Sequence, residues 1–211
     1  MVKNNQADLW EQLDSGLLKP SSDDSRNAMV RLPMLTKPER QHALRMPRDP
    51  AKINPSIVAD LRAACRGELR WPVTIRGDTG TGKTCASLVI ADYTAHASWF
   101  EFGDFCQRFA DARMGKLSMP YGSESREIGA TQWWDWLEKR RLLVLDDIRE
   151  FATVSDTRYD AVKMALDRRY GMPLILTTNL TLKEIAKAFD MRIADRLAGG
   201  TVIVATGESM R

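Results

Sequence analysis

The stretch Gly77-Asp78-Thr79-Gly80-Thr81-Gly82-Lys83-Thr84 matches the phosphate-binding pattern G-x-x-x-x-G-K-[ST] at every specified position. Its glycines allow the backbone to curl tightly, so that consecutive N–H groups can point inward at phosphate oxygens. Lys83 is expected to contact the β- and γ-phosphates of a nucleotide, and the hydroxyl of Thr84 to hold Mg²⁺. The eight loop residues and Cys85, which follows them, are therefore the predicted nucleotide-binding residues.

The segments on either side of this loop support its assignment. Residues 71–76 are rich in β-formers and lead directly into the loop, and residues 85–97 form an apolar, alanine-rich run without Pro or Gly. A strand, a glycine loop and a helix in this order are the setting that the motif requires. The alternative is a chance turn rich in Gly and Thr, which would not be expected to have a strand before it and a helix after it.

A second chemical landmark is the run Leu142-Leu143-Val144-Leu145-Asp146-Asp147. Four consecutive apolar residues are typical of a central parallel strand that is buried on both faces, and ligands bind at the carboxyl edge of such sheets. We expect Asp146 to organise Mg²⁺ and Asp147 to polarise the attacking water. The alternative is that the two carboxylates only form a turn or cap a helix.

Another buried strand is predicted over residues 173–179, and it ends in polar residues. Asn179 at that end is expected to orient the hydrolytic water. It could instead cap the next helix, but Thr181 and Glu184 already form a capping box for that helix.

The chain is predicted to consist of an N-terminal arm, residues 1–53, and an α/β domain, residues 54–211. The arm is polar and contains several prolines, and only residues 7–18 have helical spacing, with Leu9, Leu13 and Leu17 on one stripe. This short helix either docks a partner or folds back on its own domain. Asn54 and Pro55 fit the cap and first turn of a helix that is expected to end at Gly67. In the domain, five strands alternate with helices, which predicts a doubly wound parallel sheet, and residues 115–131 are expected to be a surface loop.

Composition excludes several classes of protein. The chain has 211 residues, a net charge of +3 and three cysteines without C-x-x-C spacing, so neither a disulfide framework nor a zinc site is indicated. The mild basic bias permits contact with nucleic acid without requiring it. There is no apolar run of membrane-spanning length and no signal peptide pattern, so we expect a cytoplasmic protein without membrane contacts.

The order of these motifs resembles that of the AAA+ ATPases. The loop, the Asp-Asp strand and Thr178-Asn179 are followed by Arg192-Ile193-Ala194-Asp195-Arg196-Leu197 and by a terminal Gly207-Glu208-Ser209-Met210-Arg211. This ending is similar to DnaC-type helicase loaders and IstB-type transposition helpers, and the resemblance covers about residues 55 to 211. It implies a five-stranded AAA+ core without the usual C-terminal lid.

The resemblance also implies a function. Such proteins form ATP-controlled rings or spirals on DNA and place a replicative helicase or a transposase, so the expected cofactors are ATP and Mg²⁺. By position, Asn179 corresponds to sensor 1 and Arg196 to an arginine finger that completes a neighbouring subunit's site. The alternative is that Arg196 only forms a surface ion pair with Asp195 or Asp190. A helicase loader is the leading interpretation, with a transposition helper as its alternative and a small P-loop kinase as a third. Asp147 departs from the glutamate that many AAA+ proteins use, which suggests slower hydrolysis.

Binding of single-stranded DNA is expected through Arg108, Arg113 and Lys116, by their position relative to the central channel of related AAA+ proteins. The alternative is that they only form a solvated helix face. Trp133, Trp134 and Trp136 could stack on bases, but their spacing on a helix cannot place all three on one face, so at least one is expected in the core.

Overall fold

The computed structural model describes residues 31–35, 53–121, 123–149, 155–207 and 209. The helix predicted over residues 7–18, with its leucine stripe, lies outside this part of the chain. No helix in the described part is both long enough and apolar enough to cross a membrane.

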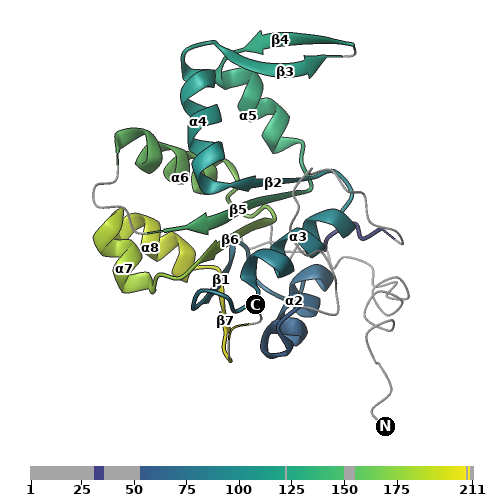
Figure 1. Cartoon of the computed structure of the whole chain (residues 1–211), viewed down its shortest axis with the longest axis vertical. Helices are drawn as coiled ribbons and strands as arrows, with labels where there is room; N and C mark the ends of the chain where they lie inside the picture. The colour runs from purple at the N-terminus through teal and green to yellow at the C-terminus, as the bar shows by residue number, and fades with distance from the viewer. Residues whose placement is uncertain (1–30, 36–52, 122, 150–154, 208, 210–211) are drawn as a thin grey trace.

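Five parallel strands form the central sheet in the order β2-β5-β6-β1-β7 (Figure 1). These strands are β1 (Val73–Gly77), β2 (Ala97–Glu101), β5 (Leu142–Ile148), β6 (Leu174–Thr178) and β7 (Thr201–Ala205). The first three residues of β1 are buried, and β6 is buried along its whole length. The predicted doubly wound parallel sheet is therefore confirmed, and no separate helical lid follows β7 within the described residues.

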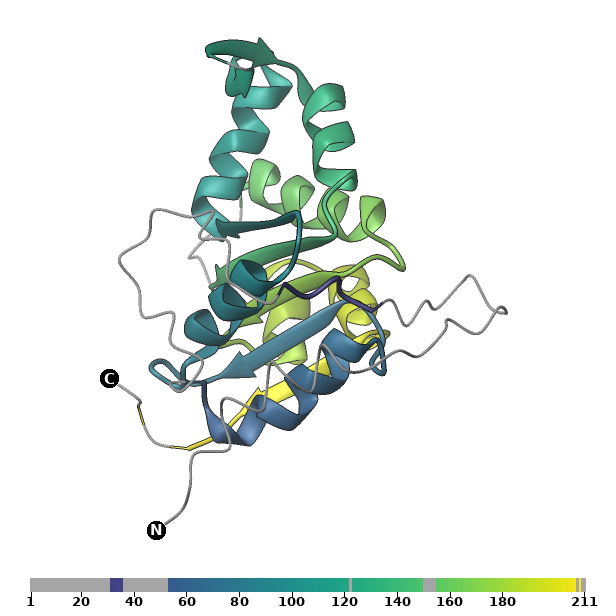
Figure 2. The same cartoon turned by 90° about the vertical axis from the view of Figure 1, so that its right-hand side faces the viewer.

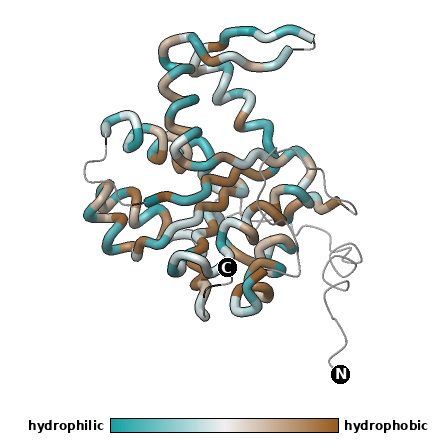
Figure 3. The backbone as a smooth tube through the Cα atoms, viewed as in Figure 1, coloured by the Kyte–Doolittle hydropathy of each residue, from teal (hydrophilic) through white to brown (hydrophobic). Residues whose placement is uncertain are grey.

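Helices cover both faces of this sheet. They are α2 (Pro55–Arg66), α3 (Lys83–Tyr93), α4 (Phe102–Arg113), α5 (Ala130–Glu138), α6 (Asp156–Arg168), α7 (Leu182–Ala188) and α8 (Met191–Ala198). Because side chains alternate along a strand, the central strands β5 and β6 each contribute to two cores. Leu142 and Val144 pack with α2 and α3, whereas Leu143 and Leu145 pack with α4, α5, α6, α7 and α8. Figure 3 shows the hydrophobic residues concentrated along the central strands.

Helix α2 begins and ends at the expected signals. The side chain of Asn54 accepts a hydrogen bond from the backbone of Ser56, and Pro55 follows as the first helical residue. Gly67 ends the helix in the left-handed conformation with φ of 74°. Thr181 and Glu184 also form the capping box that was predicted for α7.

The predicted helix over residues 85–97 is displaced. The observed α3 begins at Lys83 and ends at Tyr93, and Ala97 already belongs to β2. The hydroxyl of Thr94 donates to the carbonyl oxygen of Ile90 at 2.7 Å, and His96 takes a left-handed φ of 57° that reverses the chain. A turn that uses Thr and His instead of Gly or Pro lacks the usual sequence signals.

The prediction of a surface loop over residues 115–131 is wrong, because a hairpin of β3 (Leu117–Tyr121) and β4 (Glu124–Ile128) occupies it. Tyr121 pairs with Glu124, so only Gly122 and Ser123 connect the strands, and a two-residue Gly-Ser connection is a hairpin signal. The same region includes the first turn of α5. Figures 1 and 2 show the hairpin projecting at the far end of α4 and α5, away from the sheet.

Trp133 and Trp134 do not stack on bases. Each is 1% exposed and packs against Phe105 and Phe109 in the core between α4 and α5. Trp136 is partly buried, and the Arg140 guanidinium lies 3.9 Å from the centre of its ring. The expectation that at least one tryptophan belongs to the core is confirmed.

Part of the predicted N-terminal arm lies on the domain. Leu32 is 1% exposed, and its backbone N–H donates to the carbonyl of Cys65 at 3.0 Å. Leu35 donates to Tyr93, and Met34 forms an isolated bridge with Thr94. Residues 31–35 thus fold back on α2 and α3, while the role of the rest of the arm and its division from the domain at residue 53 stay predictions.

Candidate nucleotide-binding site

Three strand ends bring the predicted site residues to one edge of the sheet. The phosphate-binding loop follows β1, Asp146 and Asp147 lie near the end of β5, and Asn179 follows β6 directly. Since β6 pairs with both β1 and β5, it places Asn179 between the loop and the two carboxylates. These are carboxyl ends of parallel strands, where α/β sheets bind ligands.

The loop is held in a tight curl by its own atoms. Gly80 and Gly82 have left-handed φ values of 90° and 82°, which favour glycine. The buried hydroxyl of Thr81 donates to the carbonyl of Asp78 at 2.8 Å. A Cβ at Gly77 would lie 2.4 Å from the carbonyl oxygen of Ala205, so that β7 can approach the loop only because residue 77 has no side chain.

The remaining loop residues have different environments. Asp78 and Thr79 are exposed at the tip of the loop, and Cys85 is partly buried in the first turn of α3. Lys83 Nζ donates to the carbonyl oxygens of Gly77 and Asp78, at 2.7 and 2.8 Å. The ammonium group is therefore folded over the loop backbone, and it must exchange these carbonyls for phosphate oxygens to contact a nucleotide.

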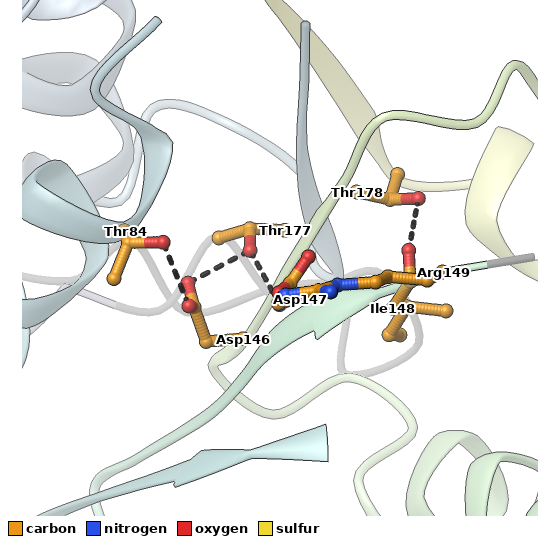
Figure 4. Close-up of polar contacts among 7 residues, drawn as sticks. All are labelled: Thr84, Asp146, Asp147, Ile148, Arg149, Thr177 and Thr178. Carbon is orange, nitrogen blue, oxygen red and sulfur yellow. Dashed lines mark hydrogen bonds and ion pairs between the residues drawn. The ribbon is translucent and has the colours of Figure 1, made fainter. Parts of the chain in front are cut away.

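Thr84 and Asp146 are joined as the motifs predict. Thr84 Oγ1 donates to Asp146 Oδ2 at 2.8 Å (Figure 4). The other carboxylate oxygen, Asp146 Oδ1, accepts hydrogen bonds from Thr177 Oγ1 at 2.8 Å and from Ser87 Oγ at 3.0 Å. Trp99 Nε1 donates in turn to Ser87 Oγ at 3.0 Å. The carboxylate is thereby held in one orientation by hydroxyl groups from α3 and β6.

Asp146 is only 3% exposed. Burial raises the pKa of its carboxyl above the ordinary value, and hydrogen bonds from Thr177, Thr84 and Ser87 lower it in part. A cation beside the carboxylate would favour the charged form that burial disfavours. The electrostatics of the site thus suit a bound positive ion.

The residues present fit Mg²⁺ and a nucleotide. Among the described residues no three His, Cys, Asp or Glu side chains gather to hold a metal by themselves. Mg²⁺ is usually held by one or two protein oxygens, with water and substrate phosphates completing the shell. The hydroxyl of Thr84 and the carboxylate of Asp146, beside the glycine loop, are a donor set of this kind.

Asp147 has a different environment from its neighbour. The pairing of β5 with β6 shifts its register between Leu145 and Ile148, and Asp147 takes a left-handed φ of 66° within this irregularity. Its backbone N–H donates to Thr177 Oγ1 at 2.8 Å. A bulge of this kind turns a side chain away from the regular alternation, and such bulges are common beside active sites.

The carboxylate of Asp147 forms an ion pair with Arg149. Arg149 Nε donates to Asp147 Oδ2 at 2.6 Å, and the side chain of Arg149 remains 63% exposed. Figure 4 shows the two side chains lying against each other, with Asp146 between them and Thr84. In this conformation one oxygen of the predicted catalytic carboxylate is occupied by an arginine.

Asn179 is exposed and lies at the strand end that was predicted for it. The residue before it is fixed, because Thr178 Oγ1 donates to the carbonyl of Ile148 at 2.6 Å and accepts from the backbone of Leu180 at 3.0 Å. The capping role is filled by Thr181, whose side chain accepts from the backbone of Glu184. The structure therefore leaves the side chain of Asn179 at the site edge, with its role in orienting water still a prediction.

Arg196 lies in the last turn of α8. It forms an ion pair with Asp167 of α6, and its side chain is 41% exposed. The partner differs from Asp195 or Asp190, the carboxylates that are nearer in sequence; Asp190 instead caps α8 and accepts from Tyr159. The three motifs on β1, β5 and β6 are brought together, whereas Arg196 is not joined to them.

Sequence reasoning missed three residues that shape this site. Thr177 and Ser87 both contact Asp146, and Arg149 contacts Asp147. Thr177 and Ser87 are buried polar residues next to apolar runs, and a buried hydroxyl needs a partner, which is the signal that could have identified them. Arg149 carries no such signal, because one charged residue after a strand is ordinary.

A scan against models of known families found no match, and a search of curated proteins found none either. Solved structures are similar, however. One is AMPPCP-bound DnaA from Aquifex aeolicus, with a TM-score of 0.60 and 17% identity, covering 74% of this chain and 47% of that chain. Another is the replication initiator DnaA bound to AMPPCP and single-stranded DNA, with a TM-score of 0.52 and 18% identity, covering 66% of this chain and 41% of that chain.

A third similar structure is the DnaC helicase loader, with a TM-score of 0.50 and 18% identity, covering 64% of this chain and 77% of that chain. The chain spans less than half of the length of either DnaA chain. Identities this low carry the fold and not the activity. The chain has the AAA+ P-loop fold that DnaA and the DnaC helicase loader share, the fold that its sequence motifs resemble.

Proposed function

We propose that this chain is an ATP-dependent helicase loader, which assembles on single-stranded DNA and on the replicative helicase and hydrolyses ATP between its own subunits. The observation that carries the ATPase part is the bond between Thr84 and Asp146, beside a glycine loop with Lys83. Two motifs that are far apart in the sequence meet where Mg²⁺ and phosphates would be held.

The roles of the residues follow from their positions. The loop N–H groups and Lys83 bind the phosphates, and Thr84 and Asp146 hold Mg²⁺, which when bound neutralises charge that develops on the phosphates. Asp147 orients the attacking water once its carboxylate leaves Arg149, and Asn179 holds the same water from the next strand. Arg196 of a neighbouring subunit stabilises the charge on the transferring phosphoryl group.

The loader role draws on the similar structures. One of them is a DnaC helicase loader, and a DnaA chain with the same fold is bound to single-stranded DNA. In this chain the proposed DNA contacts are Arg108 in the middle of α4, Arg113 at its end, and Lys116 just before the hairpin. Arg108 pairs with Asp104 and Arg113 with Asp160, so DNA phosphates would have to displace two carboxylates. We therefore expect weak, salt-sensitive binding.

The deciding experiment is a pull-down of the replicative helicase of the host with the full chain. The chain should retain the helicase with ATP and Mg²⁺, and the Lys83→Ala variant should retain less because it cannot respond to the nucleotide. Retention of a transposase instead would favour the transposition helper. A chain that hydrolyses ATP but retains neither protein would overturn the loader role and leave the ATPase.

A further inference from the structure

Asn54 connects three segments that are far apart in the sequence. Its side-chain Oδ1 accepts from the backbone of Ser56 at 2.9 Å, which caps α2. Its Nδ2 donates to the carbonyl oxygen of Thr81 in the phosphate-binding loop at 3.1 Å, and to that of Thr206 after β7 at 2.9 Å. The residue is 4% exposed, and both hydrogens of the amide have an acceptor.

The bond to Thr81 determines the orientation of the next N–H group. The carbonyl of Thr81 and the N–H of Gly82 belong to one peptide, and in a trans peptide these groups point in opposite directions. With the carbonyl held at Asn54, the N–H of Gly82 points away from Asn54. Gly82 has a φ of 82°, and a glycine peptide can turn easily, so an external bond is needed to keep this orientation.

The bond from Asn54 to Thr206 holds the segment that follows β7, which lies beside the start of the loop. Ala205 pairs with Gly77 in the sheet, at the start of the loop. The hydroxyl of Ser56 also lies 3.1 Å from the backbone N of Thr206 and 3.3 Å from its carbonyl oxygen. The start of the loop, Gly77, is therefore fixed by β7, and its later part, Thr81, by Asn54. The side-chain amide of Asn54 also bonds to Thr206, and so it connects the end of β7 to the later part of the loop.

From this arrangement we infer that Asn54 is a positioning residue for phosphate binding, which directs the N–H of Gly82 toward the nucleotide phosphates before the nucleotide arrives. The inference rests on the proposed ATP binding. It goes beyond the helix cap that the sequence predicts, because a cap needs only the acceptor oxygen of the side chain, whereas the loop uses the donor nitrogen.

The Asn54→Ser variant separates the two roles. Serine is as good a helix cap as asparagine, but its shorter side chain carries no amide to reach Thr81 and Thr206. We expect the Kd values for ATP and for ADP to rise about tenfold, since two hydrogen bonds that preset the loop are lost. The loss should appear in KM, with the turnover rate at saturating ATP falling by less than about twofold. Asp60→Asn changes an exposed position of the same helix and is the control, with Kd values expected near those of the wild type.

Three results discriminate the possibilities. Kd values of Asn54→Ser equal to those of the wild type, measured well below its melting temperature, would reduce Asn54 to a helix cap and overturn the inference. A fall in melting temperature with unchanged Kd would do the same. If the wild type itself bound neither ATP nor ADP, the proposed function would fail, and that outcome is visible before any variant is made.

Discussion

Thr84 Oγ1 lies 2.8 Å from Asp146 Oδ2, although the two residues are 62 positions apart in the chain. One is the last residue of the phosphate-binding loop motif and the other lies on β5. Both oxygens are hard ligands, and their separation allows one small cation to contact both.

The first prediction concerns this pair. Asp146→Asn should abolish the gain in ATP affinity that Mg²⁺ confers on the wild type, because an amide is a poorer ligand for Mg²⁺ than a carboxylate. The measurement is the Kd of a fluorescent ATP analogue with Mg²⁺ and with EDTA. Ser87→Ala is the control, since Ser87 also contacts Asp146 but is not a proposed ligand. A full response to Mg²⁺ in Asp146→Asn would place the metal elsewhere.

Thr177 is predicted to position both carboxylates. Its hydroxyl donates to Asp146 Oδ1 and accepts from the backbone N of Asp147, each at 2.8 Å. Thr177→Val keeps the shape of the side chain but removes both bonds. We expect the turnover rate to fall at least about tenfold, because the backbone N–H of Asp147 loses its acceptor and the residue is no longer held in its left-handed conformation. Thr177→Ser should retain most of the rate. Equal rates in the two variants would show that the hydroxyl is not needed.

Arg149 is predicted to restrain the catalytic carboxylate. Arg149→Ala frees Asp147 Oδ2, so we expect the turnover rate to rise, by up to about fivefold, because an exposed ion pair is worth at most about 1 kcal/mol. Nucleotide affinity should not change. Asp147→Asn should bind ATP and lose turnover in either background. If Arg149→Ala were slower than the wild type, Arg149 would take part in the reaction.

Arg196 is predicted to act on the nucleotide of a neighbouring subunit. Arg196→Ala and Lys83→Ala should each be inactive, whereas a mixture should recover part of the activity at hybrid interfaces, and the specific activity of the wild type should rise with protein concentration. Asp167→Asn breaks the same ion pair but keeps the arginine, so it should remain active. If Asp167→Asn were as inactive as Arg196→Ala and mixing gave no rescue, the arginine would only stabilise the packing of α6 and α8.

Arg169 is predicted to be a structural residue. It is 2% exposed and donates to the carbonyl oxygens of Leu137, Arg140 and Pro173 at 3.1, 2.8 and 2.6 Å. Arg169→Met should lower the free energy of unfolding by about 2–4 kcal/mol, because these buried acceptors lose their donor.

Its neighbour Arg168 is the matched control. Arg168 forms an exposed ion pair with Glu138, so Arg168→Met should change the free energy of unfolding by less than about 1 kcal/mol. Urea denaturation of the two variants measures the difference. Equal effects would mean that the acceptors of Arg169 find water or other donors.

The sequence by itself determined the parts of this protein that depend on local chemistry. The glycine loop, the buried run before Asp146 and the strand before Asn179 are recognisable because glycine freedom, continuous apolar character and strand ends are properties of neighbouring residues. The caps at Asn54 and Thr181 are local for the same reason.

Only the tertiary structure decided which polar groups meet. Asn54 reaches Thr206 across 152 positions, and Thr177 reaches Asp146 across 31. Arg196 pairs with Asp167 instead of the carboxylates nearest in sequence. The physical reason is that these contacts follow from the order of strands in the sheet and from the packing of helices on it. A hydroxyl or an amide finds its partner from whichever element the fold places within about 3 Å.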